Sequence, residues 1–105
     1  MDYIQRIEVE GVILRLDEQN GALVVYAKEE MRGETVDATL KDSSSVLAKT
    51  LAGYKANIVG RRVNSDFVFA AVFPRLPPGF YTVIAPFEIS EITVFPGETA
   101  EIDWR

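Results

Sequence analysis

Short apolar runs alternate with turn residues along most of this chain, and that pattern predicts β-strands rather than helices. The clearest region is the last third, where Pro-Pro-Gly at 77–79 and Pro-Gly at 96–97 separate apolar runs. Proline and glycine favour tight turns and interrupt strands, so regular spacing of such turns is typical of a β-sandwich. The predicted strands cover residues 3–16, 22–27, 34–41, 55–63, 67–73, 80–85, 87–95 and 98–105.

The connections between these strands carry residues with known turn preferences. Asp17–Gly21 predicts a hairpin turn in which Asn20-Gly21 supplies positive φ angles, and residues 64–66 predict a second hairpin. The change of apolar face near Gly11 suggests a bulge or bend. We expect Pro74–Gly79 to be a rigid connection, because proline has no amide donor and cannot lie mid-sheet.

Three stretches predict how individual strands are buried. Residues 34–41 alternate polar and apolar, which is typical of a half-buried strand. Residues 67–73 are apolar on both faces, so this strand is central, or a loop, helix or partner covers its outer face. In the last strand we expect Ala100, Ile102 and Trp104 to point inward and the alternating charged residues to point outward.

The stretch from Asp42 to Gly53 leaves two alternatives open. Ser43, Ser44 and Ser45 can cap a short helical turn near 44–53, with Leu47, Leu51 and Tyr54 on one side. An ordered loop with two apolar anchors explains the same residues. The fold class is all-β in either case: one domain, residues 1–105, folded as an antiparallel two-sheet sandwich of seven or eight strands.

The amino-acid composition limits the reactions and ligands that this chain can support. The 105 residues include no cysteine and no histidine, and the net charge is −5. Disulfides and thiolate chemistry are excluded, as are the commonest general base and the commonest transition-metal ligand. We expect no nucleic-acid partner, because the long-range field repels phosphate. No run is long enough to span a bilayer and no signal layout is present, so we expect no membrane partner and a cytoplasmic location.

A resemblance to a known family rests on Phe73 to Val83, FPRLPPGFYTV, and on Val94 to Thr99, VFPGET. These stretches resemble carboxypeptidase regulatory-like domains and the wider prealbumin-like, or transthyretin-like, sandwiches. The resemblance covers about the last 40 residues and implies a prealbumin-like fold with a scaffolding or regulatory role.

Two activities of such relatives do not transfer to this chain. Transthyretin-like hydrolases of hydroxyisourate depend on histidines, which are absent here. The lysine-to-asparagine crosslink of collagen-adhesin repeats needs a lysine in the first strand and an asparagine in the last. The chain has no lysine before Lys28 and no asparagine after Asn64.

The candidate binding residues are arginines: Arg61, Arg62 and Arg75 form the one notable basic grouping and are a possible partner contact. Adjacent strand residues point to opposite faces, so we favour ordinary solvated arginines. The acids Asp37, Asp42, Asp66, Glu88, Glu91 and Glu98 show no mark of a catalytic pair, and residues 64–66 are too short a cluster for calcium. We therefore predict no catalytic, cofactor-binding or metal site.

These observations favour a non-catalytic accessory or protein-interaction module. We expect contact with a protein partner, either a second copy or another chain, through a sheet edge or through the outer face of residues 67–73. The alternative is a carbohydrate-binding module, which needs at least two coplanar exposed aromatic rings. Of the tyrosines, we expect Tyr26, Tyr54 and Tyr81 to be partly exposed. A carboxylate-based hydrolase is a third hypothesis.

Overall fold

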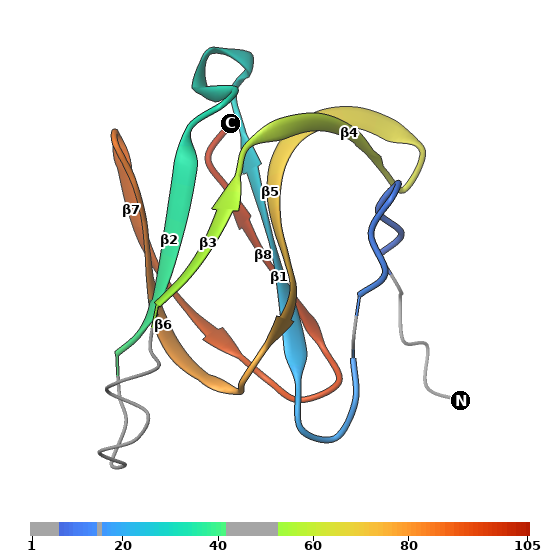
Figure 1. Ribbon diagram of the computed structural model, residues 1–105, viewed down its shortest axis with the longest axis vertical. Coiled ribbons are helices and arrows are strands. Elements are labelled where there is room, and N and C mark those ends of the chain that lie inside the picture. The colour runs from blue at the N-terminus through green and yellow to red at the C-terminus, as the bar shows by residue number, and fades with distance from the viewer. Residues whose placement is uncertain (1–6, 15, 42–52) are drawn as a thin grey trace.

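The computed structural model describes residues 7–14, 16–41 and 53–105, and these residues fold into eight strands and one 3-10 turn (Figure 1). The 3-10 turn spans Glu29–Met31. The strands are β1 (Gly21–Ala27), β2 (Thr35–Leu40), β3 (Gly53–Asn57), β4 (Val59–Val63), β5 (Asp66–Leu76), β6 (Gly79–Ala85), β7 (Glu88–Val94) and β8 (Thr99–Asp103). The predicted helical turn near 44–53 falls almost wholly outside the described residues, and Gly53 begins β3.

Two four-stranded sheets face each other, which confirms the predicted all-β sandwich. Sheet I has the strand order β4-β5-β1-β8, and sheet II has the order β3-β2-β6-β7. Neighbouring strands run antiparallel, except that β1 and β8 pair in parallel, with Val25 opposite Ile102. Parallel neighbours cannot be joined by a hairpin, so β8 reaches β1 only after the chain has crossed through sheet II.

β1 is buried along its whole length and separates two apolar clusters. The inner cluster lies between the sheets and includes Leu23, Val25, Tyr81 and Trp104. The outer cluster lies on the far side of sheet I, and its buried members are Val9, Val24, Tyr26, Val63, Ala70 and Val72. The two-faced apolar pattern of residues 67–73 is thus confirmed, since β5 contributes to both clusters.

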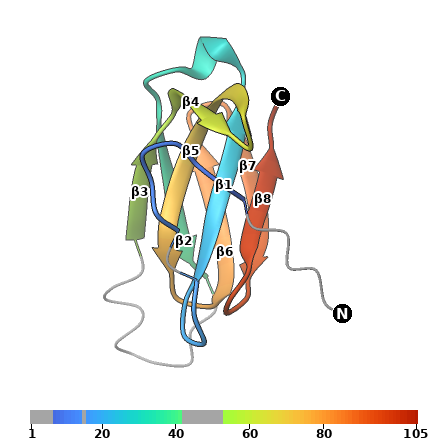
Figure 2. The same cartoon turned by 90° about the vertical axis from the view of Figure 1, so that its right-hand side faces the viewer.

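Residues 7–14, which we call the covering segment, lie across the outer face of sheet I (Figure 2). The prediction of one strand through residues 3–16 is wrong for these described residues, which form only isolated bridges. The reason is the bend expected near Gly11: Gly11 has a φ of 74°, and Val9 bridges to Val12 across it. The reversal lets Ile7, Val12 and Leu14 pack on the outer cluster.

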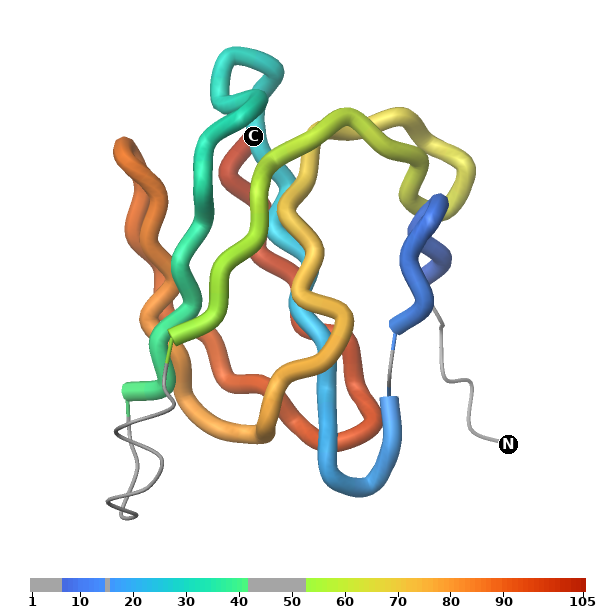
Figure 3. The backbone as a smooth tube through the Cα atoms, in the orientation of Figure 1, coloured from blue at the N-terminus to red at the C-terminus, as the bar shows by residue number. Residues whose placement is uncertain are grey.

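The covering segment is also hydrogen-bonded to the outer edge of β4 and to the turn that follows (Figure 3). The amide of Glu10 donates to the Arg62 carbonyl over 2.9 Å, and the amide of Asn64 donates to the Glu8 carbonyl over 2.9 Å. The Asn64 side chain accepts a third hydrogen bond, of 2.9 Å, from the Glu8 amide. The outer face of β5 is therefore closed by the chain itself.

The turn before β1 forms where predicted, but its backbone conformation and hydrogen bonds differ from those predicted. Neither Asn20 nor Gly21 has a positive φ. Asn20 is buried, its side chain donates to the Asp17 carboxylate, and its carbonyl accepts from the amides of Asp17 and Gly97. Asn20 therefore ties this turn to the Pro96-Gly97 turn, where Gly97 does have a positive φ of 73°.

The predicted strand 55–63 is wrong as one strand, because it divides at Ile58 into β3 in sheet II and β4 in sheet I. Ile58 is fully buried, its amide donates to the Glu34 carbonyl, and its carbonyl accepts from the Gly33 amide. These bonds hold the chain at the corner where it passes between sheets. The hairpin from β4 to β5 is confirmed, with φ of 51° at Asn64 and 74° at Ser65.

Pro74 lies inside β5, so the expectation that the connection begins there is wrong. Pro74 and Arg75 stand at a bulge, because the register shifts between the pairs Leu23–Phe73 and Gly21–Leu76. A bulge tolerates proline because the ladder is interrupted there. The rest of the Pro-Pro-Gly stretch does connect the sheets, and the Tyr81 hydroxyl donates to the Pro77 carbonyl over 2.6 Å.

Several other predictions are confirmed. The buried residues of β2 are Val36 and Ala38, as its alternation indicates. In and after β8, Ile102 and Trp104 point inward, and the Trp104 indole donates to the Ser90 hydroxyl of β7 over 2.8 Å. This bond joins the two sheets along the side formed by β7 and β8.

Gly21 and Gly53 offer a matched test of close packing. A Cβ at Gly21 would collide with the carbonyl oxygen of Phe95 and lie 2.6 Å from Val94 Cγ1, whereas nothing lies within 4 Å of one at Gly53. We expect Gly21→Ala to lower the free energy of unfolding by about 1–3 kcal/mol, because a backbone atom must move. Gly53→Ala is expected to change it by less than about 0.5 kcal/mol. Urea unfolding followed by tryptophan fluorescence measures both, and equal losses would contradict the packing at Gly21.

Candidate functional site

The three candidate arginines lie in two separate places. Arg61 and Arg62 are consecutive in β4 and point to opposite faces of sheet I, with Arg61 opposite Val68. Arg75 stands at the bulge near the other end of β5, and the stretch from Val68 to Arg75 spans about 23 Å. The structure does not bring the three side chains together, and a partner contact made by any one of them stays a prediction.

The surroundings of two of these arginines are structural in character. Arg61 is half-buried, desolvation lowers the pKa of its guanidinium, and its Nε is buried without a hydrogen-bond partner in the described part of the chain. Arg62 Nη1 donates to the Ser65 carbonyl over 3.2 Å, within the β4–β5 hairpin. The Arg62 hydrogen bond is therefore internal to the hairpin.

The candidate carboxylates are dispersed. On the outer face of sheet II, Glu91 pairs with Lys41 over 2.9 Å, and Asp37 lies 3.7 Å from Lys55. Asp42 falls outside the described residues. Among the residues that the structure describes, no three His, Cys, Asp or Glu side chains gather where they could hold a metal ion. Exposed pairs of this kind contribute about 0–1 kcal/mol each to stability.

A polar pocket on the outer face of sheet I was not predicted from the sequence. It has a volume of about 320 Å³, and its charged lining residues are Asp66, Glu101, Asp103 and Arg105. The Tyr26 hydroxyl donates to Glu101 over 2.6 Å, and the Arg105 guanidinium lies 4.7 Å from the centre of the Tyr26 ring. The alternation of apolar and charged residues in β8 predicted that these charges point outward. Tyr26 lies beside them because β1 and β8 pair in parallel, which the sequence pattern did not predict.

Three of the four charged residues of this polar pocket, Glu101, Asp103 and Arg105, make hydrogen bonds within it. Arg105 donates to both carboxylate oxygens of Asp103, over 3.0 and 2.9 Å. Hydrogen bonds from Arg105 hold the pKa of Asp103 below its usual range, so this carboxylate is ionised at neutral pH. Burial, and then the hydrogen bond to Glu101, raise the pKa of the Tyr26 phenol. The pocket therefore fastens β8 to β1.

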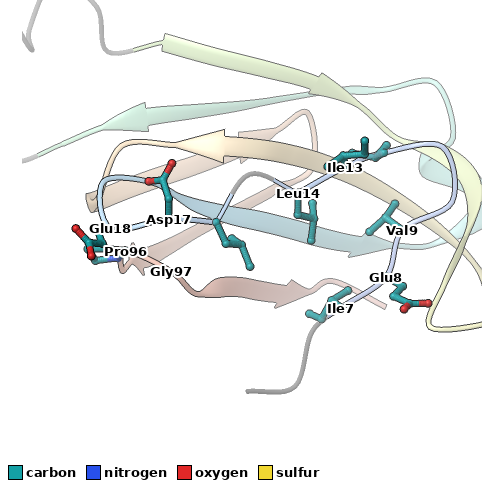
Figure 4. Close-up of a pocket in the computed structure, with 11 residues that line it drawn as sticks. Ile7, Glu8, Val9, Ile13, Leu14, Asp17, Glu18, Pro96 and Gly97 are labelled. Carbon is teal, nitrogen blue, oxygen red and sulfur yellow. The ribbon is translucent and has the colours of Figure 1, made fainter. Parts of the chain in front are cut away.

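A larger apolar groove opens beside the covering segment, as Figure 4 shows. Its volume is about 1000 Å³, and its walls come from the covering segment, the turn before β1 and the Pro96-Gly97 turn. In the close-up, Asp17 and Glu18 lie near Pro96, and Glu8 lies by Val9 towards the other end. The polar groups stand apart along the groove, which is an arrangement for apolar contact rather than for a reaction.

Three apolar side chains form an exposed group at the β6–β7 hairpin. Phe87, in the turn, is 80% exposed, Ile89 is 66% exposed and Ile84 is 39% exposed. Ile84 lies opposite Ile89 in the β6–β7 ladder, on the outer face of sheet II. We call these three residues the hairpin patch. In Figure 1 the hairpin turn stands at the margin of the molecule.

The hairpin patch borders an open strand edge. In the described part of the chain β7 pairs with β6 alone, so alternate backbone amides and carbonyls of its seven residues point away from the sheet. The edge of β4, by comparison, carries hydrogen bonds to the covering segment. The edge strand β8 presents charged outer residues, and β3 is shorter and carries Lys55. Exposed apolar groups and a free strand edge therefore coincide at β7.

Comparisons with protein-family models, with curated proteins and with solved structures give no match for this chain. Within the described residues, no helix has the length and apolar character needed to cross a membrane.

The polar pocket predicts a dependence of stability on alkaline pH. Folding raises the pKa of Tyr26, so the protonated phenol contributes to the free energy of unfolding. This contribution is complete below about pH 10, the ordinary tyrosine pKa, and declines as the pH rises beyond it. We expect Tyr26→Phe to cost about 0.5–1.5 kcal/mol at pH 8 through the lost hydrogen bond. Between pH 10 and 11.5 its unfolding free energy should fall less steeply than that of the wild type. Urea unfolding across this range measures both slopes, and identical slopes would contradict the assignment.

Proposed function

We propose that this domain is a non-catalytic protein-interaction module that binds an extended segment of a partner along the edge of β7. The observation that carries the proposal is the hairpin patch, which exposes three large apolar side chains next to a strand edge that has no partner within the described residues. Added strands gain main-chain hydrogen bonds from such an edge and specificity from neighbouring side chains. In most proteins a charged side chain, a proline or a covering element prevents such an edge from pairing with another chain.

The remaining surfaces support the same proposal. The covering segment already occupies the outer face of β5, so the apolar surface that the sequence offered to a partner is closed. In the polar pocket Arg105 pairs with Asp103, and Glu101 accepts the Tyr26 hydroxyl. Within the described residues, neither feature supplies a nucleophile with an adjacent base, which supports binding over catalysis.

The carbohydrate-binding alternative gains no support from the exposed aromatic residues. Phe67 and Phe69 are neighbours, but their rings meet edge to face at 83°, and a sugar ring stacks on parallel, coplanar rings. Phe87 and Phe95 stand at opposite ends of β7. Tyr26 and Tyr81 are buried and Tyr54 is half-buried, so the expectation of exposed tyrosines is wrong for the first two.

Two further parts of the proposal rest on sequence. The resemblance of residues 73–83 to carboxypeptidase regulatory-like and prealbumin-like domains supports a scaffolding role, since such domains commonly serve as accessory modules. A chain with no cysteine needs no oxidising compartment, which supports a cytoplasmic location.

A displayed library of random 12-residue peptides tests the β7 edge directly. We expect selection on the folded domain to enrich extended peptides with alternating apolar residues. Ile89→Lys should weaken their binding by roughly tenfold or more, because a buried charge would replace an apolar anchor. NMR titration of the wild type with one such peptide should shift the amides of residues 88–94 more than those of β3.

Ile13→Lys is the matched control, because Ile13 is likewise a largely exposed isoleucine, 80% against 66% for Ile89, but lies on the covering segment, away from β7. It should leave peptide affinity unchanged. Peptides whose binding is insensitive to Ile89→Lys, or a library that yields no binder, would overturn the proposal.

A further inference from the structure

We propose that the strand received by β7 is the β7 strand of a second copy of this chain, joined antiparallel around a two-fold axis at Ile89. This inference rests on the proposed function and names its partner. Two identical edges meet antiparallel when a two-fold axis stands perpendicular to the sheet, and the outer faces of both copies then form one continuous surface.

The axis at Ile89 aligns the apolar residues of the two hairpins. Ile89 would face the partner's Ile89, and since Ile84 already lies opposite Ile89 within each copy, four isoleucines would form one row across the joined sheet. Phe87 of each hairpin would lie beside this row. Cross-strand apolar pairs of this kind are the main stabilising contacts on an exposed sheet face.

Other registers are less favourable. An axis at Glu91 would pair more of β7, but it would place each Glu91 directly opposite the partner's Glu91, and like charges in that position are destabilising. Lys41, which contacts Glu91 over 2.9 Å, offsets only part of that repulsion because both side chains are about half exposed. An axis at Ser90 would oppose Ile89 with the partner's Glu91 and interrupt the apolar row.

Charge around the hairpin patch also permits self-association at Ile89. Glu88 would face the partner's Ser90, and Phe87 would face the partner's Glu91, so no two carboxylates stand directly opposite each other. The ladder would be short, running from residue 87 to residue 91. An interface of this size is typical of a weak, concentration-dependent dimer rather than an obligate one.

Single-cysteine variants test the register, because the chain contains no cysteine of its own. Residues that face each other across an antiparallel ladder have Cα atoms about 4.5–5.5 Å apart, within the range of a disulfide. Ile89→Cys lies on the proposed axis and should form a disulfide dimer in oxidised glutathione, which accepts the electrons of the two thiols. We expect its rate to exceed that of Glu91→Cys and of Ile13→Cys roughly tenfold, as read from non-reducing gels.

Sedimentation equilibrium of the cysteine-free chain supplies a second measurement. We expect association that rises with concentration and that Ile89→Lys weakens at least about tenfold, while Ile13→Lys leaves it unchanged. Ile89 is largely exposed, so folding of these variants is not at risk, and circular dichroism checks it.

The outcomes separate this inference from the proposed function. If Ile89→Cys crosslinks no faster than Ile13→Cys and the chain sediments as a monomer, while selected peptides still bind at β7, self-pairing is wrong and the interaction module stands. Faster crosslinking at Glu91→Cys would overturn the register at Ile89. A monomer that also binds no peptide would overturn both proposals.

Discussion

β1 is buried on both faces and paired on both edges, and the rest of the structure is arranged to satisfy that requirement. Its backbone groups bond to β5 on one side and to β8 on the other. Sheet II covers its inner face, and the covering segment supplies a partial third layer on its outer face. Without that layer, Val24 and its neighbours on the outer face would be exposed to water. The free energy of folding would then become less favourable by about 25 cal/mol for each Å² of apolar surface exposed.

This requirement also determines which surfaces remain open for partners. In reaching across sheet I, the covering segment binds the edge of β4 and thereby closes both the apolar outer face and one strand edge. In the polar pocket, the hydrogen bond from Tyr26 to Glu101 holds β8 against β1. Within the described residues no segment covers sheet II, and its outer face is largely polar or ion-paired until the β6–β7 hairpin, where Phe87 and Ile89 are exposed.

The sequence predicted correctly those elements whose structure depends only on residues close together in the chain. The alternation of β2 and β8 and the Asn64-Ser65 hairpin needed only neighbouring residues, and both are confirmed. The division at Ile58 was missed because it depends on hydrogen bonds to Gly33 and Glu34, far away in the chain. The hairpin patch was missed for a related reason. Ile84 stands between the buried Val83 and Ala85, as in any two-faced strand, and only the tertiary arrangement of the described residues shows that its outer face is open.

The parallel pairing of β1 with β8 sets an order of events during synthesis. Val25 contacts Ala71 on one side and Ile102 on the other, so a nascent chain can form the β1–β5 ladder well before β8 has left the ribosome. Until then one whole edge of the most apolar strand has no partner. During that interval the open edge is a place where nascent chains can pair with one another, and a chain that stalls before residue 99 keeps it open.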